Sequence, residues 1–244
     1  ATNLASWLLF HFPSGVDVHN EKGKLYISGW LSDGGGGIFG AGNVKIWNMS
    51  QRNFSIPVPP AGEQTLYANF RWPADLAVDE SRDKLYVVES LNNRIIRYPI
   101  QSNGDVIVNS GDLIIGSFGL GNLQFNYPQG IDVDELGEIY VADTRNHRIQ
   151  KIGVVNNNAV LRWQSGSLGN GRGSMILPYS ISVNSRHVFV SDPHAKKVLI
   201  FDRESGKFAY EFGSYNLSDN SGRKLNKLGG LVADENSLYV YNNE

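Results

Sequence analysis

Acidic and amide side chains recur at one point of a repeating pattern in this chain of 244 residues. Each follows a short apolar segment with a central aromatic residue; the positions are Glu89, Asp143, Asp192 and Asn242, and the first copy has Gly29 at this point. Ca²⁺ prefers carboxylate and amide oxygens, so one hypothesis is a metal site at Glu89, Asp143, Asp192 and Asn242. The alternative is structural, because Asp at a strand end often accepts hydrogen bonds from the amides of the next turn. The regular recurrence favours the structural interpretation.

A second group of residues combines arginine with aromatic side chains in the predicted loops. Its members are Arg71, Trp72, Tyr127, Arg145, Arg172, Tyr179 and Arg223. Arginine beside aromatic residues is typical of protein-binding hot spots and also of surfaces that stack RNA bases. We therefore expect these loops to bind a protein partner, with single-stranded RNA as an alternative ligand.

The sequence argues against several other kinds of active or cofactor site. It contains no cysteine, so disulfides and thiolate chemistry are excluded. Zinc needs about three converging ligands, and the five histidines stand at different phases of the repeat. Residues 32–42 include a Gly35-x-Gly37-x-x-Gly40 spacing, but a strand and not a helix is predicted to follow, which argues against a dinucleotide site. A non-catalytic role without a cofactor is favoured, and a metal-dependent hydrolase or lyase that uses calcium is the alternative.

Charge and hydropathy limit the remaining classes. A net charge of −2 predicts no strong general attraction to nucleic acid backbones or anionic membranes. The sequence lacks an apolar run near the ~20 residues that span a bilayer, so we expect no membrane insertion in this segment.

The side chains described above are positioned by a sequence repeat. Pro13, Pro73, Pro128 and Pro178 stand 60, 55 and 50 residues apart, and the pattern continues at Leu228. Apolar residues three and five positions after each marker alternate with others, which predicts a first strand. The second strand carries a central aromatic residue with apolar neighbours on both sides, so we expect both of its faces to be buried. These aromatic residues are Tyr26, Tyr86, Tyr140, Phe189 and Tyr239.

Two further strands complete most of the repeats. A third strand is predicted at residues 44–47, 94–98, 148–152 and 197–201, and a fourth at 54–56, 113–115, 160–163 and 208–212. Four short antiparallel strands in each unit of about 50 residues predict an all-β fold, a β-propeller whose blades bury their apolar faces against one another.

The copy at residues 128–152 also resembles a known family. It reads Gly-Ile-Asp-Val-Asp from Gly130, Ile-Tyr-Val-Ala-Asp from Ile139, and Asn-His-Arg-Ile-Gln-Lys from Asn146, which is similar to the NHL repeat. The resemblance implies an NHL-type propeller over nearly the whole chain. It does not select a function, because NHL propellers serve as scaffolds, RNA readers, sensors and enzymes.

The repeat boundaries predict one propeller domain over residues 1–244. The repeats are 13–72, 73–127, 128–177, 178–227 and a partial copy at 228–244. Residues 1–12 have the phase of a strand that completes the last blade. The ring then has about five blades with the last incomplete, and the alternative is an arc of a six-bladed propeller.

Overall fold

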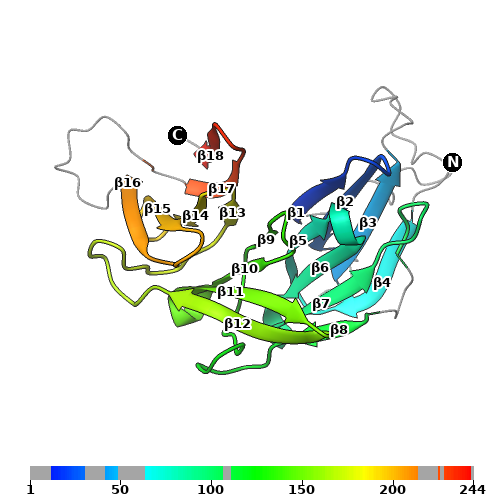
Figure 1. Cartoon of the computed structure of the whole chain (residues 1–244), viewed down its shortest axis with the longest axis horizontal. Coiled ribbons are helices and arrows are strands. Elements are labelled where there is room, and N and C mark those ends of the chain that lie inside the picture. The colour runs from blue at the N-terminus through cyan, green and yellow to red at the C-terminus, as the bar shows by residue number, and fades with distance from the viewer. Residues whose placement is uncertain are drawn as a thin grey trace, which may run out of the picture. The chain divides into compact units, whose positions relative to one another are not determined.

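The computed structural model describes residues 12–30, 42–48, 64–106, 111–213, 225 and 228–242 (Figure 1). The chain divides into two compact units, Ala1–Ile114 and Ile115–Glu244. Within the described ranges the regular elements are strands, apart from three single-turn 3-10 helices at η2 (Glu80–Arg82), η3 (Ser90–Asn92) and η4 (Thr144–Asn146). The sequence predicts that residues 1–12 complete the last blade; residues 1–11 lie outside the described ranges, and Phe12 begins the first strand of the first sheet.

The strands form antiparallel sheets in simple chain order, as the repeat predicts. Sheet 1 contains β1 (Phe12–His19), β2 (Lys24–Trp30), β3 (Gly42–Asn48) and β4 (Gln64–Phe70), and sheet 2 contains β5 (Pro73–Asp79), β6 (Lys84–Glu89), β7 (Arg94–Pro99) and β8 (Leu113–Ile115). Sheet 3 contains β9 (Ile131–Val133), β10 (Ile139–Asp143), β11 (Arg148–Val155) and β12 (Asn158–Ser165). Sheet 4 contains β13 (Ile181–Val183), β14 (His187–Asp192), β15 (Lys197–Asp202) and β16 (Phe208–Gly213), and sheet 5 contains β17 (Leu228–Ala233) and β18 (Leu238–Asn242).

The sequence predicts the fourth strand of the first repeat at residues 54–56. Residues 54–56 lie outside the described ranges, and the strand that completes sheet 1 is β4, whose Leu66 stands opposite Val44 of β3. Phe70 at the end of β4 is buried in the core of the first unit.

Consecutive sheets pack face to face within each unit. In the first unit, Tyr26 and Val44 of sheet 1 share one buried cluster with Leu76 and Ile96 of sheet 2. In the second unit one cluster joins sheets 3 and 4, and another joins sheets 4 and 5. The sheets therefore bury the apolar faces that the repeat pattern predicts.

The central aromatic of the second strand is buried in four repeats and exposed in the fifth. Tyr26, Tyr86 and Tyr140 are at most 2% exposed and Phe189 is 7% exposed, whereas Tyr239 is 62% exposed. For the fifth copy the prediction of two buried faces is therefore wrong. The reason is that β18 packs only one face against sheet 4, through Leu238 and Val240.

Carboxylates on the first strands also link neighbouring sheets. Asp17 of β1 accepts a hydrogen bond from the Val78 amide of β5 at 2.7 Å, and Asp132 of β9 accepts one from the Val183 amide of β13 at 2.8 Å. Each carboxylate also accepts from the amide of its own following residue. The same repeat position thus ties the first strands of adjacent sheets in both units.

Asp17 gives the first unit a pH-dependent stability. Burial raises the pKa of Asp17 from 3.8 to about 6, because the fold disfavours its charged form. The protonated Asp17 carboxyl therefore contributes to the free energy of unfolding below about pH 4, and this contribution is lost as the pH rises through about 6. We expect Asp17→Asn to remove this slope, so that the stability difference between variant and wild type changes by about 2–3 kcal/mol between these pH values.

Urea unfolding across this pH range, followed by far-UV circular dichroism, measures the slope. Glu21→Gln removes an exposed carboxylate and serves as the control for lost negative charge. Parallel pH profiles for Asp17→Asn and wild type would contradict the role assigned to Asp17.

Candidate functional site

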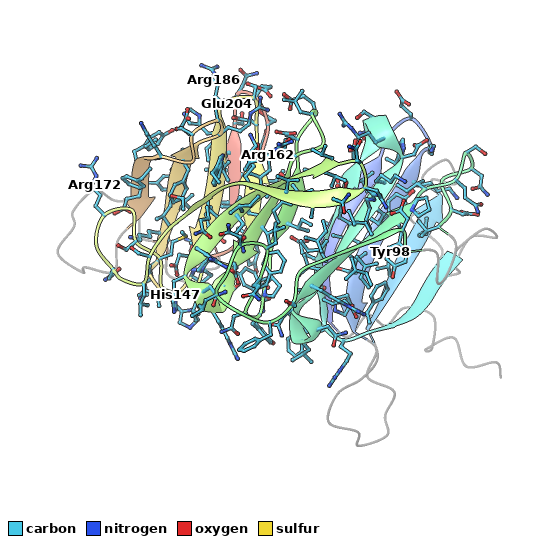
Figure 2. The ribbon with its side chains drawn as sticks, turned by 60° about the horizontal axis from the view of Figure 1, so that its bottom comes forward. Tyr98, His147, Arg162, Arg172, Arg186 and Glu204 are labelled. Atoms are coloured by element: carbon cyan, nitrogen blue, oxygen red, sulfur yellow. The ribbon has the colours of Figure 1, made fainter. Side chains whose placement is uncertain are left out.

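The strands of the second unit present two sets of loops at opposite ends. We define the upper face as residues 116–130, 143–148, 166–180 and 192–197, and the lower face as residues 134–138, 184–187, 202–207 and 234–237. Figure 2 shows Arg186 and Glu204 of the lower face at one end of the strands and His147 of the upper face at the other. Four of the predicted partner-binding residues of this unit, Tyr127, Arg145, Arg172 and Tyr179, belong to the upper-face segments.

Asp143, at the end of β10, holds two parts of the upper face together. Its side chain is fully buried and accepts hydrogen bonds from the amide of Asn126 at 2.8 Å, from Asn146 Nδ2 at 2.9 Å and from Arg148 Nε at 2.8 Å. Burial raises the pKa of the Asp143 carboxyl, and these hydrogen bonds oppose the shift. The carboxylate therefore fixes the loop before sheet 3 against the turn between β10 and β11.

The corresponding carboxylates of two other repeats make equivalent contacts. Asp192 accepts hydrogen bonds from the amides of Ile176 at 2.5 Å and Ala195 at 2.9 Å. In the first unit, Glu89 accepts from the Arg71 amide at 2.9 Å and from Arg94 Nε at 2.5 Å. In all three repeats the acceptor thus fixes the backbone two residues before the proline marker, which supports the structural interpretation of these side chains.

The fourth predicted metal ligand, Asn242, ends β18 opposite Leu228. Among the described residues there is no group of three or more His, Cys, Asp or Glu side chains placed to hold one metal ion. The carboxylates are instead distributed over successive repeats, each one next to its own loop.

Arg148 organises the loop that precedes sheet 3. Its guanidinium donates hydrogen bonds to the carbonyls of Leu120 at 2.8 Å, Gly121 at 2.9 Å and Gln124 at 2.8 Å. Arg148 is only 9% exposed, so its charge needs a nearby counter-charge. The carboxylate of Asp143 provides it. The Asn-His-Arg segment of the repeat therefore has a structural task at this point, which is to fold the loop over the end of the sheet.

The loops before sheets 3 and 4 have the same conformation. An isolated parallel β-bridge joins Phe118 to Phe125 in the first loop, and an equivalent one joins Leu168 to Met175 in the second. Gly119 and the equivalent Gly169 have φ values of 155° and 156°, in a region that side chains rarely adopt.

These loops expose apolar side chains that the sequence analysis did not select. Phe118 is 70% exposed, Leu120 is 76% exposed and Leu168 is 68% exposed. The signal that could have identified them is the recurrence of Gly119 and Gly121 at Gly169 and Gly171, 50 residues later.

Tyr127 and Arg145 are two predicted site residues that the structure brings together. The Arg145 guanidinium lies 4.4 Å from the centre of the Tyr127 ring, and the Arg145 amide donates to the Asn126 carbonyl at 3.0 Å. Tyr127 precedes a proline and has a φ of 55°, and Trp72 of the first unit has a φ of 61° at the same repeat position. Bulky residues rarely adopt this conformation, and such strain often marks functional sites.

The remaining predicted residues are more dispersed. Arg172 lies with its guanidinium 5.8 Å from the centre of the Phe208 ring, and Tyr179 is 42% exposed just before β13. Arg71 is exposed in the first unit, and Arg223 lies outside the described residues.

The turn between β10 and β11 connects the two exposed loops of the second unit. Asn146 Nδ2 donates to the Gly119 carbonyl of the first loop at 2.8 Å. The adjacent His147 contacts the Ile176 carbonyl of the second loop through Nδ1 at 2.5 Å. One turn therefore contacts both loops.

Known proteins resemble this chain in sequence. The sequence model of the NHL repeat family matches residues 125–152. The Drosophila melanogaster protein "Protein brain tumor" is 28% identical over 122 residues, which are 49% of this chain and 12% of that protein. The human "NHL repeat-containing protein 3" is 32% identical over 130 residues, which are 50% of this chain and 34% of that protein.

Solved structures resemble the fold at low sequence identity. Virginiamycin B lyase from Staphylococcus aureus, in a catalytically inactive form with quinupristin, has a TM-score of 0.59 at 17% identity, with 95% of this chain and 63% of that chain covered. A protein of unknown function from Bacteroides thetaiotaomicron has a TM-score of 0.63 at 14% identity, with 95% and 52% covered. These likenesses concern the β-propeller fold alone. In the part of the chain that the structure describes, no helix has the length and apolar character needed to cross a membrane.

Proposed function

Because this chain is an NHL-repeat protein with a β-propeller fold, we propose that it is a non-catalytic scaffold that binds a protein partner on its upper face. One observation carries the proposal. The buried carboxylates Asp143 and Asp192 fix the inter-sheet loops, and these loops expose Phe118, Leu120 and Leu168 to solvent. Large apolar side chains on a rigid support lose little conformational entropy when they become buried against a partner.

Two other ligands remain alternatives to a protein partner. A metal-dependent hydrolase or lyase would need Asp143 or Asp192 to exchange its backbone contacts for a calcium ion. An RNA-binding surface would use Tyr127 and Arg145 to stack bases, and its affinity would depend steeply on salt.

A random-peptide display selection against the whole chain tests the proposal. We expect the selected peptides to lose about tenfold or more in affinity when Phe118 and Leu168 are both changed to serine. The matched control changes Leu136 and Val155 to serine, because these two residues are 58% and 45% exposed near the lower ends of the strands. If the selected peptides bind the upper-face variant as tightly as wild type, the proposed surface is wrong.

A further inference from the structure

We propose that the upper face of the second unit recognises an acidic protein segment that also carries apolar side chains. This inference rests on the proposed function and names the chemistry of the partner. It follows from the distribution of charge and exposed apolar surface over the two ends of the strands.

The exposed charges on the upper face are cationic. Arg145 and Arg172 are both exposed, and neither forms an ion pair with a carboxylate of the described residues. Both guanidinium groups lie near aromatic rings: that of Arg145 lies near Tyr127, and that of Arg172 lies near Phe208 of β16, which stands opposite Phe201 toward the lower ends of the strands. This arrangement orients each cation while its outer edge stays open to a partner's carboxylate.

The carboxylates near this face are buried or paired with a basic side chain. Asp143 and Asp192 are fully buried, and Asp143 is paired with Arg148 at 2.8 Å. Glu211, close to the upper end of β16, is paired with Lys197 at 3.1 Å. Within the described part of the upper face, no exposed Asp or Glu would repel an acidic ligand.

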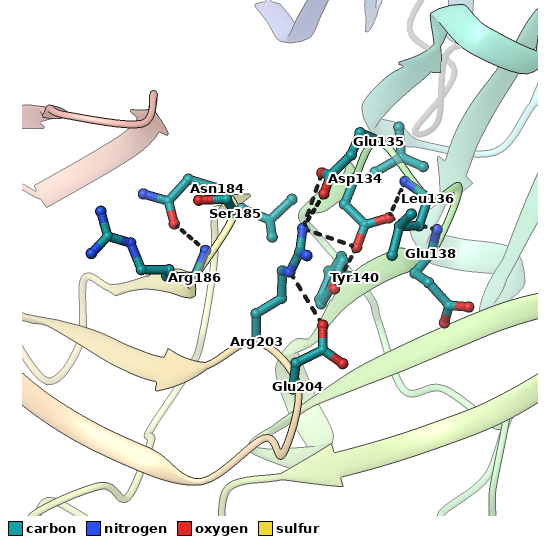
Figure 3. A network of polar contacts seen from close by, with 12 residues as sticks. Asp134, Glu135, Leu136, Glu138, Tyr140, Asn184, Ser185, Arg186, Arg203 and Glu204 are labelled. Atoms are coloured by element: carbon teal, nitrogen blue, oxygen red, sulfur yellow. Dashed lines mark hydrogen bonds and ion pairs between the residues drawn. The ribbon is translucent and has the colours of Figure 1, made fainter.

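On the lower face of the same unit, the exposed acidic side chains outnumber the exposed basic ones, which are Arg186 and Lys207. Glu135 and Glu204 have side chains that are 63% and 72% exposed, and Asp234 and Glu235 are exposed in the turn between β17 and β18. The basic side chain at the centre of these acids, Arg203, is only 7% exposed (Figure 3). An acidic partner would therefore be repelled by the lower face and attracted to the upper one.

The apolar side chains favour protein over RNA as the partner. Leu120 and Leu168 are aliphatic and highly exposed, and they offer no flat surface on which a base could stack. Together with Phe118 they suit the side chains of a protein segment, while Arg145 and Arg172 pair with its carboxylates. The loops that carry them are joined through Asn146 and His147 of one turn.

Short labelled peptides added to the whole chain test the inference. The first peptide alternates glutamate with leucine and phenylalanine, the second replaces every glutamate by lysine, and the third probe is an oligouridylate. We expect the acidic peptide to bind, and the double variant Arg145→Glu, Arg172→Glu to bind it about tenfold or more weakly. The same variant should gain affinity for the lysine peptide. Such a gain would show that the loss of acidic-peptide binding comes from the changed charge and not from misfolding.

The control variant is Arg186→Glu, which reverses an exposed charge on the lower face and should leave peptide binding unchanged. Equal or tighter binding of wild type to the lysine peptide would overturn the inference, and so would tighter binding to the oligouridylate. The display selection keeps the two hypotheses separate. If selected peptides depend on Phe118 and Leu168 but lack acidic residues, the proposed function stands and this inference fails.

Discussion

Replacing Asp134 by alanine is expected to lower the free energy of unfolding of the second unit by about 3–5 kcal/mol. The Asp134 side chain is 1% exposed and accepts hydrogen bonds from Tyr140 Oη at 2.8 Å and from the Glu138 amide at 2.9 Å (Figure 3). Burial and the neighbouring Asp134 raise the pKa of Tyr140, so the phenol remains a neutral donor. Without the carboxylate, this buried hydroxyl loses its acceptor.

Arg203 explains why the loss should extend beyond one sheet. It comes from the turn between β15 and β16 of sheet 4, and its guanidinium lies 3.6 Å from Asp134 of sheet 3. Its carbonyl accepts hydrogen bonds from Trp163 Nε1 at 3.1 Å and from Lys151 Nζ at 3.3 Å, both in sheet 3. Among the described residues, removal of Asp134 leaves Arg203 with Glu135, which accepts its hydrogen bonds at 2.8 and 3.0 Å, and with the exposed Glu204. The contact between the two sheets is therefore weakened.

Urea unfolding of the Asp134→Ala variant measures the effect. The control is Glu204→Ala, which removes an exposed carboxylate 3.6 Å from Arg203 and should change stability by no more than about 0.5 kcal/mol. An Asp134→Ala variant that differs from wild type by less than about 1 kcal/mol would show that solvent replaces the lost contacts.

The sheets could be predicted from the sequence because their determinants are local. Alternation around Ile131 and Val133 and the aromatic residue at Tyr140 each define a strand without reference to distant residues. Alternation did not identify β4 at residues 64–70, and the fourth strand predicted at 54–56 lies outside the described residues. Phe70 at the end of β4 is buried between two sheets.

The candidate site could be predicted only in part. Asp143 was recognised as a recurring carboxylate, but its role depends on the Asn126 amide, which lies 17 residues earlier in the chain. Phe118 and Leu168 were missed because apolar residues are expected in the core, whereas Arg148 and Lys197 hold these loops over the sheet ends. Spacing along the sequence does not reveal contacts that form only after the sheets have assembled.

Replacing Asp143 by alanine is the second change with a large expected effect. It removes the acceptor of the Asn126 amide and leaves Arg148, which is 9% exposed, without its counter-charge. We expect the free energy of unfolding to fall by about 3–5 kcal/mol. Asp143→Asn keeps the shape of the side chain and one acceptor oxygen, so a smaller loss of about 1–3 kcal/mol is expected.

Hydrogen exchange on the same variants separates the scaffold role of Asp143 from metal binding. In the scaffold interpretation, the amides of Leu123 and Phe125 exchange faster in Asp143→Ala, because Arg148 no longer fixes the loop carbonyls that it contacts. Added calcium should leave the stability of wild type unchanged, because the carboxylate oxygens are occupied by hydrogen-bond donors. If calcium raises the stability of wild type but not of Asp143→Asn, then Asp143 is a metal ligand and the scaffold interpretation is wrong.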